Sequence, residues 1–600
     1  MQLRSLLITP ITLLFAGLPA LPAMAAHDHD PEWLDGTQFD QGVYVKIHHP
    51  RVIRELSSFG GGLVVSNVDG ESDALVREVR YHLGSASGPL VRRPDHALAT
   101  RRTAYAEYKS VRKALEGAAG GRDPVRAEEL VRRRTVSMFE VAEGAFVDRF
   151  DVDDAWVDPD AVSYRMTVEI DLVQNGVART LRKPVVIPIQ PPLPNGTGSM
   201  RRVAYDALTG VSRALPHQPG DAQLGGGSAW YAGDQHLHTA YSIDSFFLHL
   251  NVFNAGFYAL AADLYGLDWI ITTDHSNIHF SLLGYEWYSA DQHQAGTEQT
   301  ENYRNATGFQ AYCGQEMGLG QQGFFNEPSH YLAWPKDQDS MGYLENPGSG
   351  LVFGHLNCES EQVIIDRVND AGGIGFVAHP FVGQSLFYEE WDFDNGATGW
   401  AGFEIWCSSG GVLGSSDEQA IAKWFELLAG IPAPQGGALP PRPGFPTRYP
   451  VGIGDSDAHT IMDIGRTFTY SRLDELSRPG IMAGFTGGRC VASNGPLAFG
   501  MLNGAGPGGV ATGVATGANT IEVTLQSTSE FGPVGDYEIS VLVDGSPRVV
   551  VPPSGQPGDS AVIVIDNLML GPEDGFVNVF ATSSVGPPRA MANPIWLQFD

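Results

Sequence analysis

The sequence has few cysteines, fewer basic than acidic residues, and no long hydrophobic run after its N-terminus. Its four cysteines, among 600 residues, include no Cys-x-x-Cys pair, which argues against a thiolate zinc site or a redox motif. Lysine and arginine total 38 against 69 acidic residues, and the net charge of −31 argues against a surface that binds nucleic acid. After residue 25, no stretch is long and apolar enough for a membrane span.

The first 25 residues have the pattern of a secretory signal peptide. Arg4 supplies the positive start, residues 6–21 are mainly apolar, and Ala23-Met24-Ala25 offers a cleavage site. We therefore expect a periplasmic or secreted protein. Export permits disulfides, and buried free thiols are the alternative. The four cysteines are Cys313, Cys358, Cys407 and Cys490.

Composition divides the remaining chain into three parts. Residues 26–227 contain basic, helix-forming segments and then two alternating strands around Asn175-Gly176, a strong hairpin signal. This predicts an N-terminal α+β domain whose basic helix face is either simply solvated or a docking surface for an acidic partner. Residues 499–600 are short strands separated by Gly, Pro and Ser, which predicts a C-terminal β-sandwich. Neither part shows a catalytic constellation.

Residues 228–498 carry the chemistry. A short apolar run leads into Asp234-Gln235-His236-Leu237-His238, and side chains alternate along a strand, so His236 and His238 point the same way and suit one metal ion. Further apolar strands end in, or begin with, metal-ligand residues. Apolar strands that end repeatedly in such residues are typical of a βα barrel, whose chemistry collects at the C-terminal strand ends. These further residues are His275, Glu316, His330, His379, Asp457 and His459.

The order of these motifs resembles the PHP superfamily, the polymerase and histidinol phosphatase metallohydrolases, over roughly residues 229–498. The tail, Asp463 to Thr467 and Gly488 to Pro496, is similar to the larger bacterial members, which include the carbaryl hydrolases. The resemblance implies an α/β fold, a distorted (β/α)7 barrel, with up to three metal ions.

The resemblance also implies a ligand set. The residues for the first ion are His236, His238, Glu316 and Asp457. Glu316 would bridge to a second ion bound by His379 and by one further histidine, either His330 or His355. We favour His330, because its strand follows Glu316 as the pattern expects. The residues for the third ion are Asp244, His275 and His459; some family members have histidine in place of Asp244.

Histidine and carboxylate ligands without thiolates favour zinc, manganese or iron in a catalytic role. Two to three such ions acidify a bridging water and stabilise charge on the attacked oxygen, so hydrolysis is the expected reaction. The predicted catalytic residues are Asp457, His459 and Arg466. Arg466 would either grip a substrate anion or fix its loop. Asp274 and Asp455 are expected to orient ligands.

Phosphoester hydrolysis is the first expectation, because the family mostly performs it. Hydrolysis of a carbamate, ester or amide is the alternative, and a binding protein without turnover is a third reading. Two aromatic-rich insertions, 278–288 and 381–400, suit a small-molecule substrate with an apolar or aromatic part if they rim the pocket. Ordinary packing of long loops is the more frequent explanation of such insertions. Glu404 either lines the site or is a buried structural carboxylate.

Overall fold

The computed structural model describes most of residues 39–600. Residues 1–25, for which a signal peptide is predicted, lie outside the described residues, as do Asp244 and Cys358. The gaps are 55–57, 84–88, 119–132, 134–136, 138–140, 142–143, 153–161, 198–199, 216–228, 243–244, 246–250, 252, 277–278, 281–284, 287–288, 320–328, 337–341, 345–350, 353–354, 357–359 and 383–389. Within the described residues, no helix is long and apolar enough to span a membrane.

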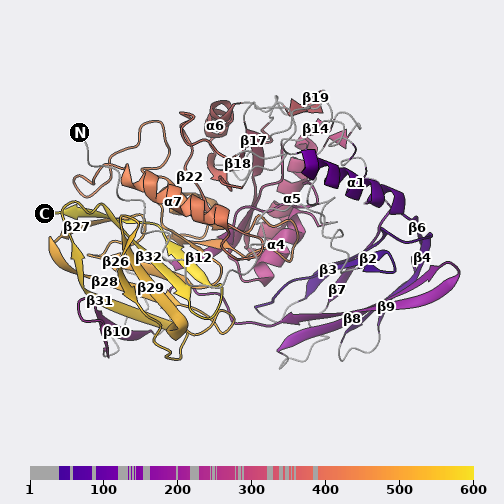
Figure 1. Ribbon diagram of the computed structural model, residues 1–600, viewed down its shortest axis with the longest axis horizontal. Coiled ribbons are helices and arrows are strands. Elements are labelled where there is room, and N and C mark those ends of the chain that lie inside the picture. Colours follow the sequence, from indigo (N-terminus) through magenta and orange to yellow (C-terminus); the bar gives the residue numbers. More distant parts are fainter. Residues whose placement is uncertain are drawn as a thin grey trace.

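The N-terminal part contains two antiparallel sheets and a long helix (Figure 1, indigo and purple). The hairpin predicted at Asn175-Gly176 is confirmed, since the strands on either side pair along their whole length. One sheet consists of β1 (Phe39–Asp40), β2 (Val43–His48), β3 (Phe59–Asn67) and β7 (Phe146–Val152). The other consists of β4 (Ala74–Leu83), β5 (Leu90–Arg92), β6 (His96–Leu98), β8 (Ser163–Gln174) and β9 (Val177–Pro188), and the helix is α1 (Arg102–Ala118).

The central part builds two sheets whose strands carry the predicted ligands. In the first, β12 and β13 pair in parallel, as do β13 and β16. In the second, β21, β22 and β23 are parallel, whereas β18 runs antiparallel to both of its neighbours. These strands are β12 (Ala229–Asp234), β13 (Trp269–Thr272), β16 (Gln310–Cys313), β17 (Gln315–Leu319), β18 (Ser329–Trp334), β21 (Ile374–Ala378), β22 (Gly402–Cys407) and β23 (Val451–Asp455).

Helices lie between these strands along the chain and pack against them. The residues at the two ends of α5 explain where this helix begins and ends. The Ser289 hydroxyl accepts a hydrogen bond from the Gln292 backbone N–H, and the Ser289 backbone N–H donates one to the Gln292 side chain. Gly308 ends the helix with a left-handed backbone at φ 85°. The helices are α4 (Ala255–Leu264), α5 (Ala290–Thr307), α6 (Glu361–Asp370), α7 (Ser415–Ala429) and α8 (Arg478–Thr486). The short strands are β14 (His279–Phe280), β15 (Tyr285–Glu286), β19 (Leu351–Val352) and β20 (His355–Leu356).

Two bridges connect the strand ends that carry ligands. Leu237 pairs in parallel with Ala458, and His275 pairs in parallel with Glu316. The first bridge joins the end of β12 to the end of β23, and the second joins β13 to β17. The backbones of the ligand segments are therefore hydrogen-bonded to one another, which fixes where their side chains begin.

The C-terminal part is rich in strands (Figure 1, orange and yellow) and shares its sheets with the rest of the chain. Strand β24 pairs with β12, β24 with β25, and β25 with β33, so one sheet runs from the centre into this part. The strands are β24 (Phe468–Leu473), β25 (Cys490–Ser493), β26 (Leu497–Leu502), β27 (Val510–Val514), β28 (Gly517–Gln526), β29 (Tyr537–Val543), β30 (Ser546–Val551), β31 (Ser560–Leu570), β32 (Phe576–Ser583), β33 (Arg589–Ala592) and β34 (Ile595–Phe599), and a 3₁₀ turn spans Val534–Asp536.

Three details differ from the sequence expectations. Glu316 does not end a strand but is the second residue of β17, because the expected single strand is interrupted at Gly314. Glu404 lies in the middle of β22. Strands β10 (Arg201–Asp206) and β11 (Val211–Ala214) precede the expected boundary at residue 227, yet β10 pairs in parallel with β31 of the C-terminal part. The domain boundaries stay predictions.

The described cysteines are buried and form no disulfide with one another. Cys313, Cys407 and Cys490 have no disulfide partner among the described residues. The described aromatic residues of the second insertion also pack inward. Trp391 and Trp400 are 3% and 4% exposed, and Phe393 stacks on Phe381 and contacts Phe403. For these residues, core packing accounts for the aromatic content without a substrate.

Candidate metal centre

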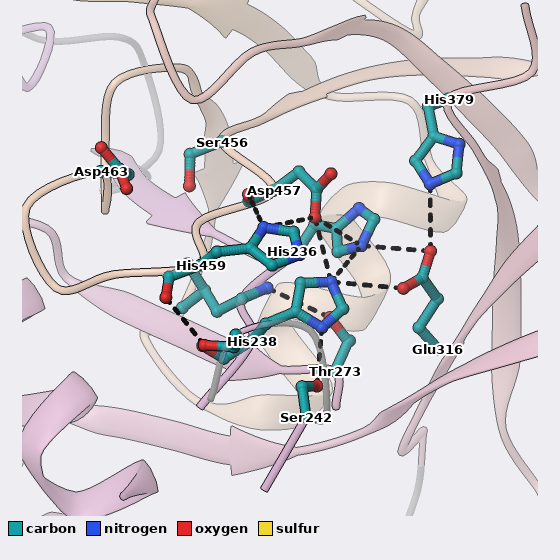
Figure 2. Close-up of polar contacts among 12 residues, drawn as sticks. His236, His238, Ser242, Thr273, Glu316, His379, Ser456, Asp457, His459 and Asp463 are labelled. Carbon is teal, nitrogen blue, oxygen red and sulfur yellow. Dashed lines mark hydrogen bonds and ion pairs between the residues drawn. The ribbon is translucent and has the colours of Figure 1, made fainter. Parts of the chain in front are cut away.

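The ligand residues predicted from the motifs converge on a single buried cluster (Figure 2). Five overlapping groups have their ligand atoms within 4.8 Å of one another; one is His236–Glu404–Cys407–Asp455, and the other four consist of predicted ligands. The members come from strands far apart in the sequence, so the fold brings them together. The four groups of predicted ligands are His236–His238–Glu316, His236–His379–Asp457, His275–Glu316–His330 and His238–His275–His459.

Glu316 is the centre of the cluster. Its carboxylate is fully buried, and its two oxygens face five imidazole rings. The nearest nitrogens on Oε1 are His330 Nδ1 at 2.7 Å, His379 Nε2 at 3.1 Å and His236 Nε2 at 3.3 Å. Those on Oε2 are His275 Nδ1 at 2.9 Å and His238 Nε2 at 3.2 Å. A carboxylate surrounded in this way is suited to bridging two cations.

Outer hydrogen bonds fix which nitrogen of His236 and His238 faces inward. His236 Nδ1 lies 2.7 Å from Glu404 Oε1, an acceptor. His238 Nδ1 lies 2.9 Å from the Ser242 hydroxyl, which itself donates to Asp274 and so accepts from the ring. In the neutral form of each ring, Nδ1 therefore carries the proton, and Nε2 is the atom that faces the cluster and would bind a metal ion. This is the arrangement in which outer partners orient metal-binding histidines.

Asp457 completes the inner face. Its Oδ1 lies 3.2 Å from His236 Nε2 and 3.0 Å from His238 Nε2. Its backbone is left-handed at φ 48°, and that of His379 has φ 25°. Such values cost about 1–3 kcal/mol for residues other than glycine and persist where the surroundings enforce them. Two strained residues thus place side chains in the cluster.

His459 is oriented by its own loop. Its Nδ1 lies 2.9 Å from the Asp457 carbonyl oxygen, so Nδ1 carries the proton and Nε2 is the lone-pair atom. Its ring stacks on His238 at 4.4 Å between centroids, and His275 stacks on His238 at 4.5 Å. The two histidines predicted for a third ion therefore flank the same ring.

Buried carboxylates support the cluster from behind. Asp274 accepts hydrogen bonds from the Thr239 N–H, the Thr239 hydroxyl and the Ser242 hydroxyl at 2.6, 2.9 and 2.9 Å. It acts on His238 through Ser242, which agrees with the orienting role expected for it. Asp234 accepts from the Ser456 hydroxyl at 2.5 Å and the Gly465 N–H at 2.8 Å, so it ties the end of β12 to the loop after β23.

Glu404 holds two ligand residues at once. One oxygen faces His236 Nδ1, and the other accepts the His379 backbone N–H at 2.5 Å. Its neighbour Asp455 is also fully buried, and burial and then the charge of Glu404 raise the pKa of Asp455 well above its usual value. Burial opposes ionisation of Glu404, but His236 outweighs it and lowers the pKa of Glu404. Glu404 is thus the ionised partner of the pair.

The charges of the cluster balance one another. Burial opposes ionisation of Glu316, yet His330, His275 and His236 hold its pKa well below the usual value. Burial also opposes charging of His236, yet Asp457, Glu316 and Glu404 raise its pKa well above the usual value. The carboxylates are thus poised to be ionised, as metal ligands must be.

These observations test whether divalent ions fit the residues. The Nε2 atoms of His236 and His238 lie 3.0 Å apart beside the carboxylates of Glu316 and Asp457. Groups that converge at this distance need a cation among them, either a proton, which the raised pKa of His236 favours, or a metal ion in its place. The donor set of imidazoles and carboxylates suits zinc, manganese or iron. The residues fit a divalent metal.

The structure brings together His236, His238, His275, Glu316, His330, His379, Asp457 and His459. Asp244 lies outside the described residues, and for His355 only the backbone, in β20, is described. His330 lies against Glu316, which supports the choice of His330. Sequence reasoning did not identify Ser242, although a hydroxyl four residues after His238 was a usable signal.

Arg466 lies apart from the other predicted catalytic residues. Burial and then the charge of Arg51 lower its pKa, and Asp463, Tyr265 and Glu530 are its other charged or polar neighbours. Among the described residues, the groups that interact electrostatically with Arg466 most strongly do not include Glu316 or the cluster histidines. This surrounding favours the reading in which Arg466 fixes its loop.

Comparisons with known proteins give only weak likenesses. No family model and no curated protein matches the chain. A two-domain protein from Bacteroides vulgatus containing a predicted PHP-like metal-dependent phosphoesterase is 14% identical, with 62% of this chain and 96% of that chain covered and a TM-score of 0.33. β-Glucuronidase 3 of Bacteroides uniformis is 10% identical, with 93% and 64% covered and a TM-score of 0.17. A Parabacteroides merdae β-glucuronidase is 8% identical, with 93% and 65% covered and a TM-score of 0.18. At these TM-scores, we base the argument on the site.

Proposed function

We propose that the chain is a metal-dependent hydrolase that cleaves phosphoesters with two to three divalent ions. The observation that carries the proposal is Glu316, a buried carboxylate within 3.3 Å of five imidazole nitrogens and next to the inward-facing His236 and His238. An ionised carboxylate has about four lone-pair sites, so hydrogen bonds to Glu316 would not account for all five imidazoles around it. A cluster built for cations accounts for them.

The roles follow from position. His236, His238, Glu316 and Asp457 would hold one ion, Glu316 with His330 and His379 a second, and His275 with His459 a third. Bound divalent ions supply Lewis acidity and lower the pKa of a ligated water. Asp457, the carboxylate nearest to both His236 and His238, would orient the attacking water by accepting a hydrogen bond. His459 would face the substrate side beside His238.

We also propose that the central strands form the distorted (β/α)7 barrel expected from the motif order. The pairings of β12 with β13, β13 with β16, β17 with β18, β18 with β21, β21 with β22 and β22 with β23 support it. The Leu237–Ala458 bridge, between the ends of β12 and β23, is the pairing that a closed ring needs. Export to the periplasm or medium, guided by residues 1–25, is part of the same proposal.

The test is hydrolysis by purified protein reconstituted separately with zinc, manganese or iron. Aryl phosphate monoesters and diesters and an aryl carbamate would be compared on the same sample. The proposal expects metal-dependent release of the phenol from a phosphate ester. Preference for the carbamate would replace the substrate class but keep the metal site, and absence of turnover with every metal would favour a binding role.

A further inference from the structure

We propose that Tyr265 and Arg51 are positioning residues for the metal centre, and that Glu530 of the C-terminal part fixes them. The inference rests on the proposed function, because it concerns the loop that supplies Asp457 and His459. We call residues 456–466 the ligand loop. The N-terminal and C-terminal parts would then be required for metal binding and not only for stability.

The ligand loop is held from the inside by central residues. Asp234 accepts hydrogen bonds from Ser456 at its start and from Gly465 near its end. The Ser245 hydroxyl lies 2.7 Å from the His459 carbonyl oxygen. These contacts fix one face of the loop. They leave the segment after His459 to be held from the other face.

Tyr265 supplies that outer contact. Its hydroxyl donates to the Ile461 carbonyl oxygen at 2.5 Å and accepts the Arg51 backbone N–H at 2.7 Å. Both Tyr265 and Ile461 are 1% exposed, so water does not replace this bond readily. Ile461 follows His459 by two residues. A shift of Ile461 therefore moves the His459 ring, which stacks on His238.

Arg51 and Arg54 connect Tyr265 to the outer parts of the chain. The Arg51 guanidinium lies 3.3 Å from Glu530 Oε1 and donates to the Gly465 carbonyl oxygen of the ligand loop at 3.5 Å. Arg54 Nη1 lies 2.6 Å from Glu530 Oε2, and Arg54 Nε donates to the Tyr265 carbonyl oxygen at 2.9 Å. The Glu530 carboxylate thus holds both arginines, and these arginines donate hydrogen bonds to Tyr265 and to the ligand loop.

The side chains of Arg51, Arg54 and Glu530 are largely buried, which strengthens the interactions between their charges. The side chains of Arg51, Arg54 and Glu530 are 21%, 6% and 17% exposed. Ion pairs at such sites are screened much less than surface pairs, and removal of one partner leaves the other charge buried without compensation. Neutralising Glu530 would therefore loosen both arginines. The disturbance would reach the ligand loop through the Tyr265 hydroxyl and Gly465.

The experiment titrates metal-free protein with cobalt(II) chloride and follows the visible absorption of bound cobalt. The variants are Tyr265→Phe and Glu530→Gln. Each is expected to bind the weakest cobalt ion at least about 10-fold less tightly than the unmodified protein, the usual scale for loss of an outer partner. The site formed by Glu316, His330 and His379 should keep its affinity, because none of these three residues belongs to the ligand loop.

Tyr205→Phe is the matched control. Tyr205 is also buried, and its hydroxyl donates to a backbone carbonyl oxygen, that of Val550, across another junction with the C-terminal part. It should lower the melting temperature without changing cobalt affinity. If Tyr265→Phe does not fold, Glu530→Gln, which keeps the Tyr265 hydroxyl, decides alone.

The outcomes separate two failures. If the unmodified protein binds cobalt but both variants bind it equally well, the positioning role is wrong and the junction serves only stability. If the unmodified protein binds no cobalt, the proposed function fails, and the positioning role fails with it. Weaker binding in both variants, with unchanged binding in Tyr205→Phe, supports the inference.

Discussion

The Nε2 atoms of His236 and His238 lie 3.0 Å apart, while the Nδ1 atoms of both rings face acceptors outside the cluster. Both Nε2 atoms thereby face one point that also receives Asp457 and Glu316. These groups need a cation among them, which is a proton on His236 in the metal-free protein, in line with its raised pKa, and would be a metal ion in the loaded protein. Most of the predictions below follow from that relationship.

Chelation should lower the stability of the protein, and added metal should restore it. An ion at 100 times its dissociation constant stabilises the folded state by about 2.7 kcal/mol, provided that it does not bind the unfolded chain. The measurement is the urea midpoint with a chelator and after addition of zinc or manganese. A midpoint that does not change with metal would contradict the cluster's role.

Asp457→Asn should lower kcat/KM for an aryl phosphate by at least about 100-fold, because a neutral amide binds a divalent ion and orients water more weakly than a carboxylate does. Asparagine tolerates the left-handed backbone found at φ 48°, so the loss would be chemical and not conformational. Asp474→Asn, at an exposed carboxylate, is the control and should retain full activity. Equal activity of Asp457→Asn and Asp474→Asn would show that Asp457 is not part of the active site.

Glu404→Gln should weaken metal binding by about 10–100-fold while leaving every ligand in place. Glutamine keeps the size of the side chain but cannot accept both the His236 Nδ1–H and the His379 backbone N–H. The dissociation constants would be measured by competition with a chromophoric chelator. Glu522→Gln, at a half-exposed carboxylate, should bind metal as tightly as the unmodified protein.

The metal-free protein should lose stability as the pH rises above about 6.5, the ordinary pKa of histidine. Burial opposes the charging of His236, but Asp457, Glu316 and Glu404 raise its pKa in the folded state well above that value. A raised pKa stabilises the folded state below the unfolded pKa, and this contribution disappears as the pH passes through the folded pKa.

Urea unfolding between pH 6 and pH 9, with a chelator present, measures this effect. Bound metal replaces the proton on the cluster, so the metal-loaded protein should not show the same decline. His236→Ala should flatten the profile of the metal-free protein. A metal-free protein that becomes more stable over this range would refute the charge balance described for the cluster.

Local patterns predicted the elements that carry the ligands. Alternation placed His236 and His238 on one side of the chain after β12, and the Asn175-Gly176 turn predicted the β8–β9 hairpin, which the structure confirms. Both features depend on residues close in sequence. The expected barrel stays a prediction, supported by strand pairing.

Contacts between residues far apart in the sequence could not be predicted from local patterns. Glu404 contacts His236 across 168 residues, and no spacing rule connects them. The pairing of β10 with β31 depends on which sheet edge is open after folding, and not on the sequence of β10. Sequence therefore identified the ligands better than the residues that orient them.

Metal content of the purified mature protein is the measurement that tests the central claim most directly. Elemental analysis after reconstitution and removal of free ions should give two to three equivalents of zinc, manganese or iron per chain. A His236→Ala, His238→Ala double variant should give at least one equivalent fewer. Absence of bound metal in the unmodified, folded protein would contradict the account.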